Sequence, residues 1–108
     1  TIEDLAAKYT LDACFEWKRS AEPFVTNPGS MTQKLTQAIA DVTGVRPELS
    51  TGGGTSDARF ISSISRETVE FGPINATIHS VNECAGIDEL EALAEIYYRT
   101  AKAYLENF

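Results

Sequence analysis

Residues 49–61 read Leu-Ser-Thr-Gly-Gly-Gly-Thr-Ser-Asp-Ala-Arg-Phe-Ile. Three successive glycines let the backbone turn sharply and bring its N–H groups close to a carboxylate or phosphate. Ser56 or Asp57 is placed to begin a short helix carrying Arg59, whose planar guanidinium suits a carboxylate. The stretch therefore predicts either an anion-binding turn or a flexible turn followed by a surface salt bridge. It is not the phosphate loop of nucleotide-binding proteins, because the lysine of that motif is absent.

A longer helix is predicted on each side of this stretch. Upstream, Ser30 can cap a helix that stops at Gly44, and one apolar stripe runs along it: Met31, Leu35, Ala38, Ile39 and Val42. Downstream, a helix is expected from about Asp88, with Glu91 completing a capping box. Its buried face is predicted to consist of Leu90, Leu93, Tyr97, Ala101 and Tyr104.

Extended segments are predicted between these helices and before them. Residues 12–19 alternate in character, with Phe15 and Trp17 on one side, as in a strand with one buried face. Residues 46–50 and 68–71 are also expected to be extended, the latter because they are β-branched and aromatic. This alternation of strands and helices predicts an α/β fold in which helices cover a sheet.

The opening residues form a unit too small to bury a core. Thr1 to Asp4 has the pattern of a capping box, so a short helix is expected to run to Lys8 before the extended residues 12–19. A helix and one strand cannot make an independent core, so the unit is expected to need a partner. Residues 21–30 contain two prolines and a glycine and connect this unit to the rest.

Composition excludes some classes of protein. The 108 residues carry a formal net charge of −7, and the 9 Lys and Arg residues form no run, which argues against nucleic-acid binding. No membrane-spanning stretch or signal pattern is present, so a cytoplasmic protein without a membrane partner is expected. Cys14 and Cys84 have no metal-binding or redox spacing and are expected to be buried or half-buried thiols.

The single histidine, His79, is the candidate metal ligand. A lone histidine is more often a surface residue or a hydrogen-bonded core residue. His79, however, lies in a polar loop after a predicted strand, where Glu83 could orient it, and neutral imidazole is the commonest metal ligand. One imidazole cannot hold zinc alone, because zinc takes about three or four protein ligands. Ser20 and Asn75 are hydrogen-bonding residues in other predicted loops.

Three blocks together carry a resemblance. They are RSAEPF at residues 19–24, the stretch at residues 49–61, and VEFGPINATIHSVNE at residues 69–83. In this order and spacing they resemble the last third of the succinyl-diaminopimelate desuccinylases, a family of the zinc aminoacylase and carboxypeptidase clan. The likeness runs through the whole chain. One mild departure is Ala58, where relatives often have glycine.

The resemblance implies an architecture. It implies a zinc-exopeptidase-type catalytic domain, a sheet covered by helices, with an inserted lid domain that forms a homodimer interface. Residues 1–22 would be the end of the lid and dimerisation domain. Residues 23–108 would be the carboxy-terminal part of the zinc catalytic domain.

The resemblance also implies site residues. His79 corresponds to the last ligand of a two-zinc site. Gly54, Thr55 and Arg59 correspond to residues that contact the succinyl carboxylate, and Ser20 and Asn75 to further substrate contacts. The other zinc ligands and the general-base glutamate belong to a part of the family's sequence that precedes these blocks. No catalytic residue is therefore expected among residues 1–108.

The implied reaction is hydrolysis of N-succinyl-LL-2,6-diaminopimelate to succinate and LL-2,6-diaminopimelate, a step in lysine and cell-wall precursor biosynthesis. The 108 residues alone are expected to be inactive, to hold zinc incompletely or not at all, and to self-associate or require the amino-terminal part. The alternatives are another zinc deacylase or aminopeptidase of the same clan, and a non-catalytic structural or interaction module.

Overall fold

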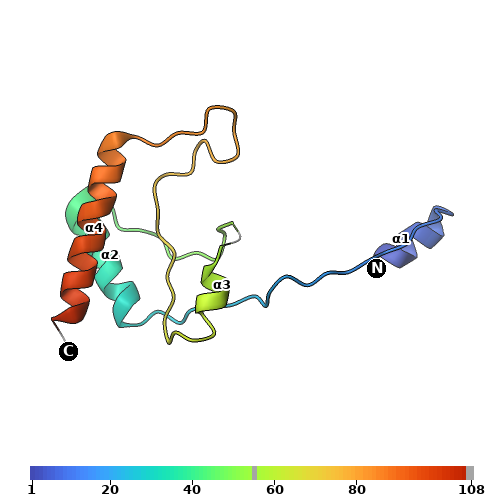
Figure 1. The fold of residues 1–108 in the computed structure, drawn as a ribbon, viewed down its shortest axis with the longest axis horizontal. Helices are drawn as coiled ribbons and strands as arrows, with labels where there is room; N and C mark the ends of the chain where they lie inside the picture. The colour runs from blue at the N-terminus through green and yellow to red at the C-terminus, as the bar shows by residue number, and fades with distance from the viewer. Residues whose placement is uncertain (55, 107–108) are drawn as a thin grey trace.

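The computed structural model describes residues 1–54 and 56–106, and these residues form four helices. In chain order they are α1 (Ile2–Lys8), α2 (Ser30–Thr43), α3 (Ala58–Ile61) and α4 (Ile87–Leu105). Figure 1 shows α2 and α4 side by side at one end of the molecule and α1 at the far end of an extended arm. Each helix lies where local sequence signals predict one. None of the helices described combines the length and apolar character needed to span a membrane.

The hydrophobic core lies between α2 and α4. It joins the predicted apolar stripe of α2 to Ile96 of α4, which is only 2% exposed. Its members are Leu35, Ala38, Ile39 and Ile96, with Val42, Val69 and Phe71 packed against them. The Lys34 ammonium adds a polar tie by donating a hydrogen bond to the carbonyl of Ala103. The stripe predicted for α2 is therefore confirmed.

α4 turns a different face to the core from the one predicted. Ile96 and Thr100 are buried, whereas Leu90, Tyr97 and Ala101 are exposed. Of the predicted set, two residues are half-buried, Leu93 and Tyr104. Thr100 tolerates burial because its hydroxyl donates to the carbonyl of Ile96 at 2.8 Å. The prediction was wrong because the buried face is shifted by one position along the helix, from Tyr97 and Ala101 to Ile96 and Thr100. Periodicity alone does not distinguish two adjacent stripes on one helix.

The helix ends follow local signals at some positions and not at others. α1 has the predicted capping box, in which the Thr1 hydroxyl accepts from the Asp4 N–H at 3.2 Å. α2 ends at Gly44 as predicted, and its φ of 73° lies in the left-handed region that glycine adopts easily. At the start of α4 the cap is Gly86, and the capping box predicted with Glu91 is not formed.

The start of α2 is capped from a distant part of the chain. Ser30 does not cap it, because Gly29 is the N-cap residue and Glu67 supplies the acceptors. The Glu67 carboxylate accepts from the N–H groups of Gly29 at 2.9 Å, Met31 at 3.0 Å and Thr32 at 2.7 Å, and from the Thr32 hydroxyl. A Cβ at position 29 would lie 2.6 Å from this carboxylate, so a larger residue there would require the Glu67 side chain to shift.

The predicted sheet is not confirmed, because no strand is formed in residues 1–54 and 56–106. Residues 12–19, 46–50 and 68–71 form neither helix, strand nor turn, and they lack the paired neighbour that a strand requires. Between the connecting residues 21–30 and residues 68–71, the Thr26 hydroxyl donates to the carbonyl of Thr68 and accepts from its N–H. A side chain bridges the segments there, in place of a backbone ladder.

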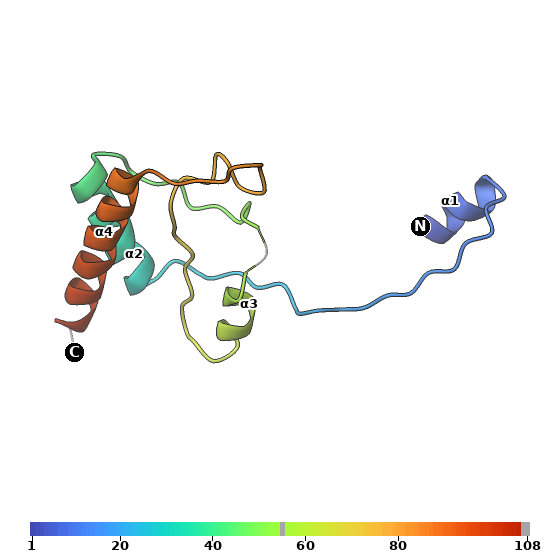
Figure 2. The same cartoon turned by 45° about the horizontal axis from the view of Figure 1, so that its top comes forward.

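The first 22 residues extend away from the rest. Figures 1 and 2 both show α1 separated from α2, α3 and α4 by an extended segment. The radius of gyration of 19.4 Å exceeds the about 13 Å expected for a compact domain of this length. Trp17 is 72% exposed, so the predicted buried face of residues 12–19 is not formed. Cys14 and Cys84 are exposed free thiols, contrary to the expectation that they are buried.

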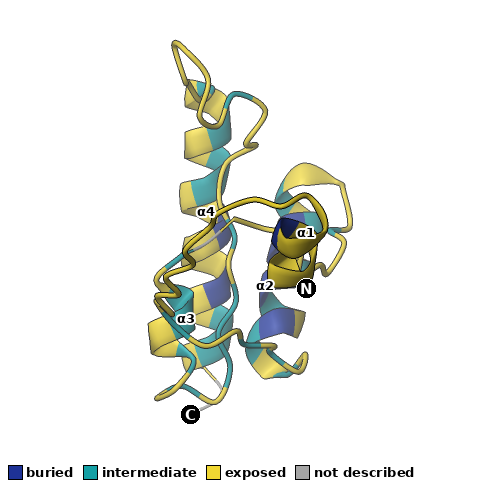
Figure 3. Cartoon of the chain, turned by 90° about the vertical axis from the view of Figure 1, so that its right-hand side faces the viewer, coloured by how far each residue is buried: buried dark blue, intermediate teal, exposed yellow. Residues whose placement is uncertain are grey.

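Burial is concentrated in one place. Figure 3 shows buried residues mainly on α2 and α4, and connecting segments that are largely exposed. Leu11 and Phe15 in the arm are also exposed. Large apolar side chains facing solvent are consistent with the expectation that the opening unit needs a partner.

Candidate functional site

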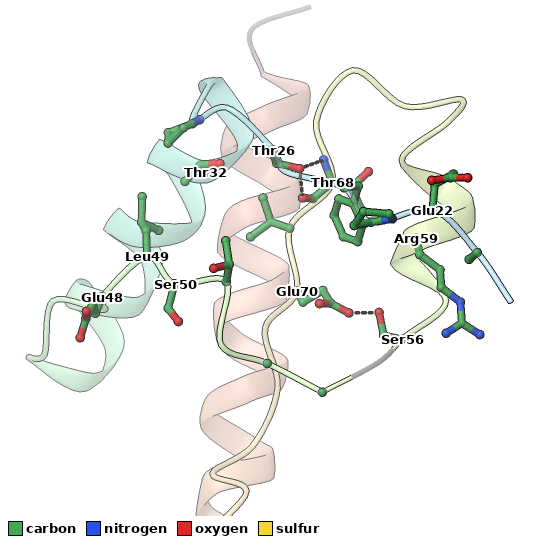
Figure 4. Close-up of a pocket in the computed structure, with 18 of the residues that line it drawn as sticks. Glu22, Thr26, Thr32, Glu48, Leu49, Ser50, Ser56, Arg59, Thr68 and Glu70 are labelled. Carbon is green, nitrogen blue, oxygen red and sulfur yellow. Dashed lines mark hydrogen bonds between the residues drawn. The ribbon is translucent and has the colours of Figure 1, made fainter. Parts of the chain in front are cut away.

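A cavity of about 730 Å³ opens beside α3. Its walls come from residues 20–24, 26 and 28, from residues 48–51, 53, 54 and 56, and from residues 68–70, together with Thr32 of α2 and Arg59 of α3. Figure 4 shows Leu49 and Ser50 on one side, Arg59 on the other, and Thr26, Thr68 and Glu70 between them. Segments far apart in sequence therefore meet around one space.

The walls are joined by the two contacts described above and by a third. Thr26 bridges to Thr68, and Glu67 fastens the adjoining segment to the start of α2. At the third point the Ser56 hydroxyl contacts the carboxylate of Glu70, and the same hydroxyl accepts from the Ala58 N–H at 3.0 Å. Of the two predicted starts, Asp57 is the N-cap residue of α3. Ser56 lies just before it and joins the glycine turn to residues 68–70.

Arg59 supplies the cation of the cavity. The residue is half-buried, and its Nε is fully buried with no hydrogen-bond partner among the described residues. Its guanidinium carbon lies 4.8 Å from the centre of the Phe60 ring. No ion pair with Arg59 forms in the part of the chain that the structure describes, so its charge can attract an anionic ligand.

Three carboxylates share the cavity with Arg59. Glu22, Glu48 and Glu70 line it, and Glu22 is paired with Arg19 outside the wall. An anion is therefore attracted at Arg59 and repelled elsewhere, whereas an ammonium group is favoured near the carboxylates. The cavity suits a ligand that carries both kinds of charge. Sequence patterns do not predict this mixture of charges, because isolated glutamates usually lie on a solvated surface.

The glycine turn contributes Gly53 and Gly54 to the wall of the cavity. Ser20 and Gly54 both line it. Thr55, predicted to contact the same ligand, lies outside the described residues. A Cβ at Gly53 or Gly54 would meet no atom within 4 Å, so in this structure the glycines leave open space beside the cavity.

His79 and Asn75 do not line this cavity. They lie in the exposed segment of residues 75–86, drawn in orange in Figures 1 and 2, which both views show apart from α3. Glu83 accepts from the backbone N–H of His79 at 3.4 Å. Glu83 was expected to orient the His79 side chain. In the described residues it contacts the main chain of His79 and makes no hydrogen bond to the imidazole. The structure brings Ser20, Gly54 and Arg59 together and leaves the other two apart.

The residues present can offer zinc one ligand. His79 is exposed, so its imidazole is accessible to a metal, and imidazole nitrogen is a common zinc ligand. The described residues contain no group of three or more His, Cys, Asp or Glu side chains that could hold a metal ion. Further ligands would have to come from outside these residues.

Comparison with known proteins identifies relatives over nearly the whole chain. The model of the family described as peptidase family M20/M25/M40 matches residues 8–103. The chain is 51% identical over 98 residues to a succinyl-diaminopimelate desuccinylase of Aromatoleum aromaticum, which covers 91% of the chain and 26% of the relative. It is 49% identical over 104 residues to the protein of that name from Leptothrix cholodnii, covering 96% and 27%.

A third relative gives the same result. The succinyl-diaminopimelate desuccinylase of Nitrosococcus oceani is 44% identical over 104 residues, covering 96% of the chain and 28% of the relative. The chain thus spans about a quarter of the length of the curated relatives it matches.

Proposed function

We propose that this chain, which belongs to peptidase family M20/M25/M40, is part of a longer hydrolase. That longer protein is called the whole enzyme below. The whole enzyme would cleave N-succinyl-LL-2,6-diaminopimelate into succinate and LL-2,6-diaminopimelate. The observation that carries the proposal is identity of 44–51% to three proteins named for this activity.

The charges of the cavity support this substrate class. A succinylated diamino acid carries a carboxylate on its succinyl group and a free amino group at the other end. Arg59 has unpaired donors for the carboxylate, with Ser20 and Gly54 beside it. Glu48 and Glu70 can attract the ammonium group. Thr55 and Asn75 complete the proposed set of substrate contacts.

His79 is proposed as one zinc ligand. When bound, a zinc pair supplies Lewis-acid activation of the amide carbonyl and of water. The remaining ligands and the general base would come from the rest of the whole enzyme, since the described residues hold no metal-binding group of three. The role of this chain is therefore to bind and orient the substrate and to contribute one imidazole.

The proposal includes an arrangement of domains. Residues 1–22 would belong to a lid and dimerisation domain, and residues 23–108 to the catalytic domain. The exposed arm and its apolar side chains support a partner surface for the first unit. In the whole enzyme residues 46–50 and 68–71 would gain strand neighbours and form the proposed α/β sheet. The whole enzyme is proposed to be a cytoplasmic homodimer.

An assay of acyl-group preference tests the function. The zinc-loaded whole enzyme should hydrolyse the N-succinyl substrate with kcat/KM about 10–100-fold above that for the N-acetyl analogue. The acetyl group lacks the carboxylate that Arg59 would bind. The 108-residue chain, assayed in parallel, should release no product. Preference for the acetyl compound would favour another deacylase of the family, and no hydrolysis of either would leave a non-catalytic module.

A further inference from the structure

The loop that precedes α4 has one side chain withdrawn from solvent. Every residue of 72–85 is exposed except Thr77, which is half-buried. The residues on either side of it, Ala76 and Ile78, are both exposed, although both are apolar. Burial of apolar surface therefore does not explain why Thr77 alone turns inward, and the reason lies in its hydrogen bonds.

Thr77 closes the loop on itself. Its hydroxyl accepts from the N–H of Cys84 at 3.1 Å and donates to the carbonyl of Cys84 at 2.9 Å. Its own carbonyl accepts from the N–H of Ser80 at 3.0 Å. One side chain thus occupies both main-chain groups of Cys84 and makes residues 77–84 a closed loop that contains His79.

His79 depends on this closure because of its backbone. Its φ of 61° lies in the left-handed region, which is unfavourable for a residue with a Cβ and persists only where the surroundings impose it. The hydrogen bond from its N–H to Glu83 is long, at 3.4 Å, and is too weak to impose it alone. The bonds made by Thr77 are shorter and span the loop.

We infer that Thr77 is a positioning residue, which fixes the direction of the His79 imidazole toward a metal by closing the loop through the backbone of Cys84. The inference rests on the proposed function, in which His79 is a zinc ligand. Thr77 does not touch the metal in this arrangement. It holds the main chain from which the ligand projects, as hydrogen-bonded neighbours commonly do for metal ligands.

The test compares zinc affinity among variants of the whole enzyme, measured by competition with a chelator. Thr77→Val keeps the shape of the side chain but removes both bonds to Cys84, so it should weaken zinc binding by about 10–100-fold. Thr77→Ser keeps the hydroxyl and should restore the parental affinity. Ser80→Ala is the matched control from the same loop, because the Ser80 side chain takes no part in the closure.

The variant His79→Ala separates this inference from the proposed function. If His79→Ala binds zinc as tightly as the parent, the ligand assignment is wrong and the inference has no basis. If His79→Ala loses zinc while Thr77→Val retains the parental affinity, the ligand stands and the positioning role is refuted. Loss of affinity in both, with rescue by Thr77→Ser, is the expected result.

A second measurement needs no variant and covers the case in which Thr77→Val does not fold. Hydrogen exchange of the parental enzyme reports directly on the Cys84 N–H. This amide should exchange slowly for a residue in an exposed loop, because it donates to Thr77. Exchange as fast as that of the neighbouring exposed amides would show that the closure is absent and would overturn the inference.

Discussion

At the scale of single residues, Arg59 determines what the cavity can bind. Its guanidinium is the cation among three carboxylates, and its Nε is buried without a partner in the described chain. No ion pair neutralises this guanidinium among the described residues, so an anionic ligand in the cavity would gain a charge-assisted partner. Arginine also presents its donors as a planar fork, which lysine cannot reproduce.

Arg59→Lys in the whole enzyme should therefore raise KM for the succinylated substrate by about 10–100-fold, because the charge remains but the fork is lost. Steady-state kinetics measure this, with Arg66→Lys as the control, since Arg66 is exposed and does not line the cavity. A KM that stays at the parental value would remove Arg59 from the substrate site.

The residues of the site differ in how far the sequence predicts them. Ser20, Gly54 and Arg59 could be found because each belongs to a block with a recognisable local pattern. Glu67 could not, since it caps a helix whose N-cap residue, Gly29, lies 38 residues earlier, and no local signal marks that pairing. Glu48 and Glu70 were missed for a similar reason, because only the fold shows that they face a shared space.

At the scale of elements, Glu67 ties the start of α2 to the segment that lines the cavity. Burial raises the pKa of this carboxyl. Hydrogen bonds from the Thr32 hydroxyl and from the N–H groups of Thr32, Met31 and Gly29 lower the pKa, and their combined effect is larger than that of burial. The net result is a pKa below the ordinary glutamate value. Each of these bonds favours the ionised form, so the charge of Glu67 stabilises the folded chain.

The sign of the pH effect follows from that lowered pKa. The contribution of Glu67 to the free energy of unfolding is fully present above the ordinary glutamate pKa and is lost as the pH falls through the lower folded-state value. Glu67→Gln should therefore cost about 1–2 kcal/mol at neutral pH and progressively less in acid.

Urea unfolding of the 108-residue chain, followed by helical circular dichroism across this pH range, measures the difference. Glu16→Gln is the matched control, because Glu16 lies in the exposed arm. A Glu67→Gln effect that is equally large in acid, or that is absent at neutral pH, would contradict the capping role.

The elements also show why helices were easier to predict than strands. A helix satisfies its backbone locally, so a capping box at Thr1 and a glycine at position 44 were enough to locate helix ends. A strand needs a neighbouring strand. Neither residues 12–19 nor residues 46–50 could find one nearby in the sequence, so any partner would have to come from a distant segment. The pattern of side chains therefore predicted strands that the described residues do not form.

At the scale of the whole molecule, the parts of the proposed site are not assembled by these residues alone. Ser20, Gly54 and Arg59 share one cavity, whereas His79 and Asn75 lie on a loop whose hydrogen bonds within the described chain close it on itself. The closure fixes the shape of the loop and leaves its position relative to the cavity to other contacts. The same holds for the arm, whose apolar side chains face solvent.

A crystal structure of the whole enzyme with zinc and succinate tests the central claim most directly. Anomalous scattering at the zinc edge should place a metal about 2.0–2.1 Å from an imidazole nitrogen of His79. The same crystal should show a succinate carboxylate on the guanidinium of Arg59, in the pocket that holds this zinc. A zinc site formed without His79, or a succinate bound away from Arg59, would contradict the account.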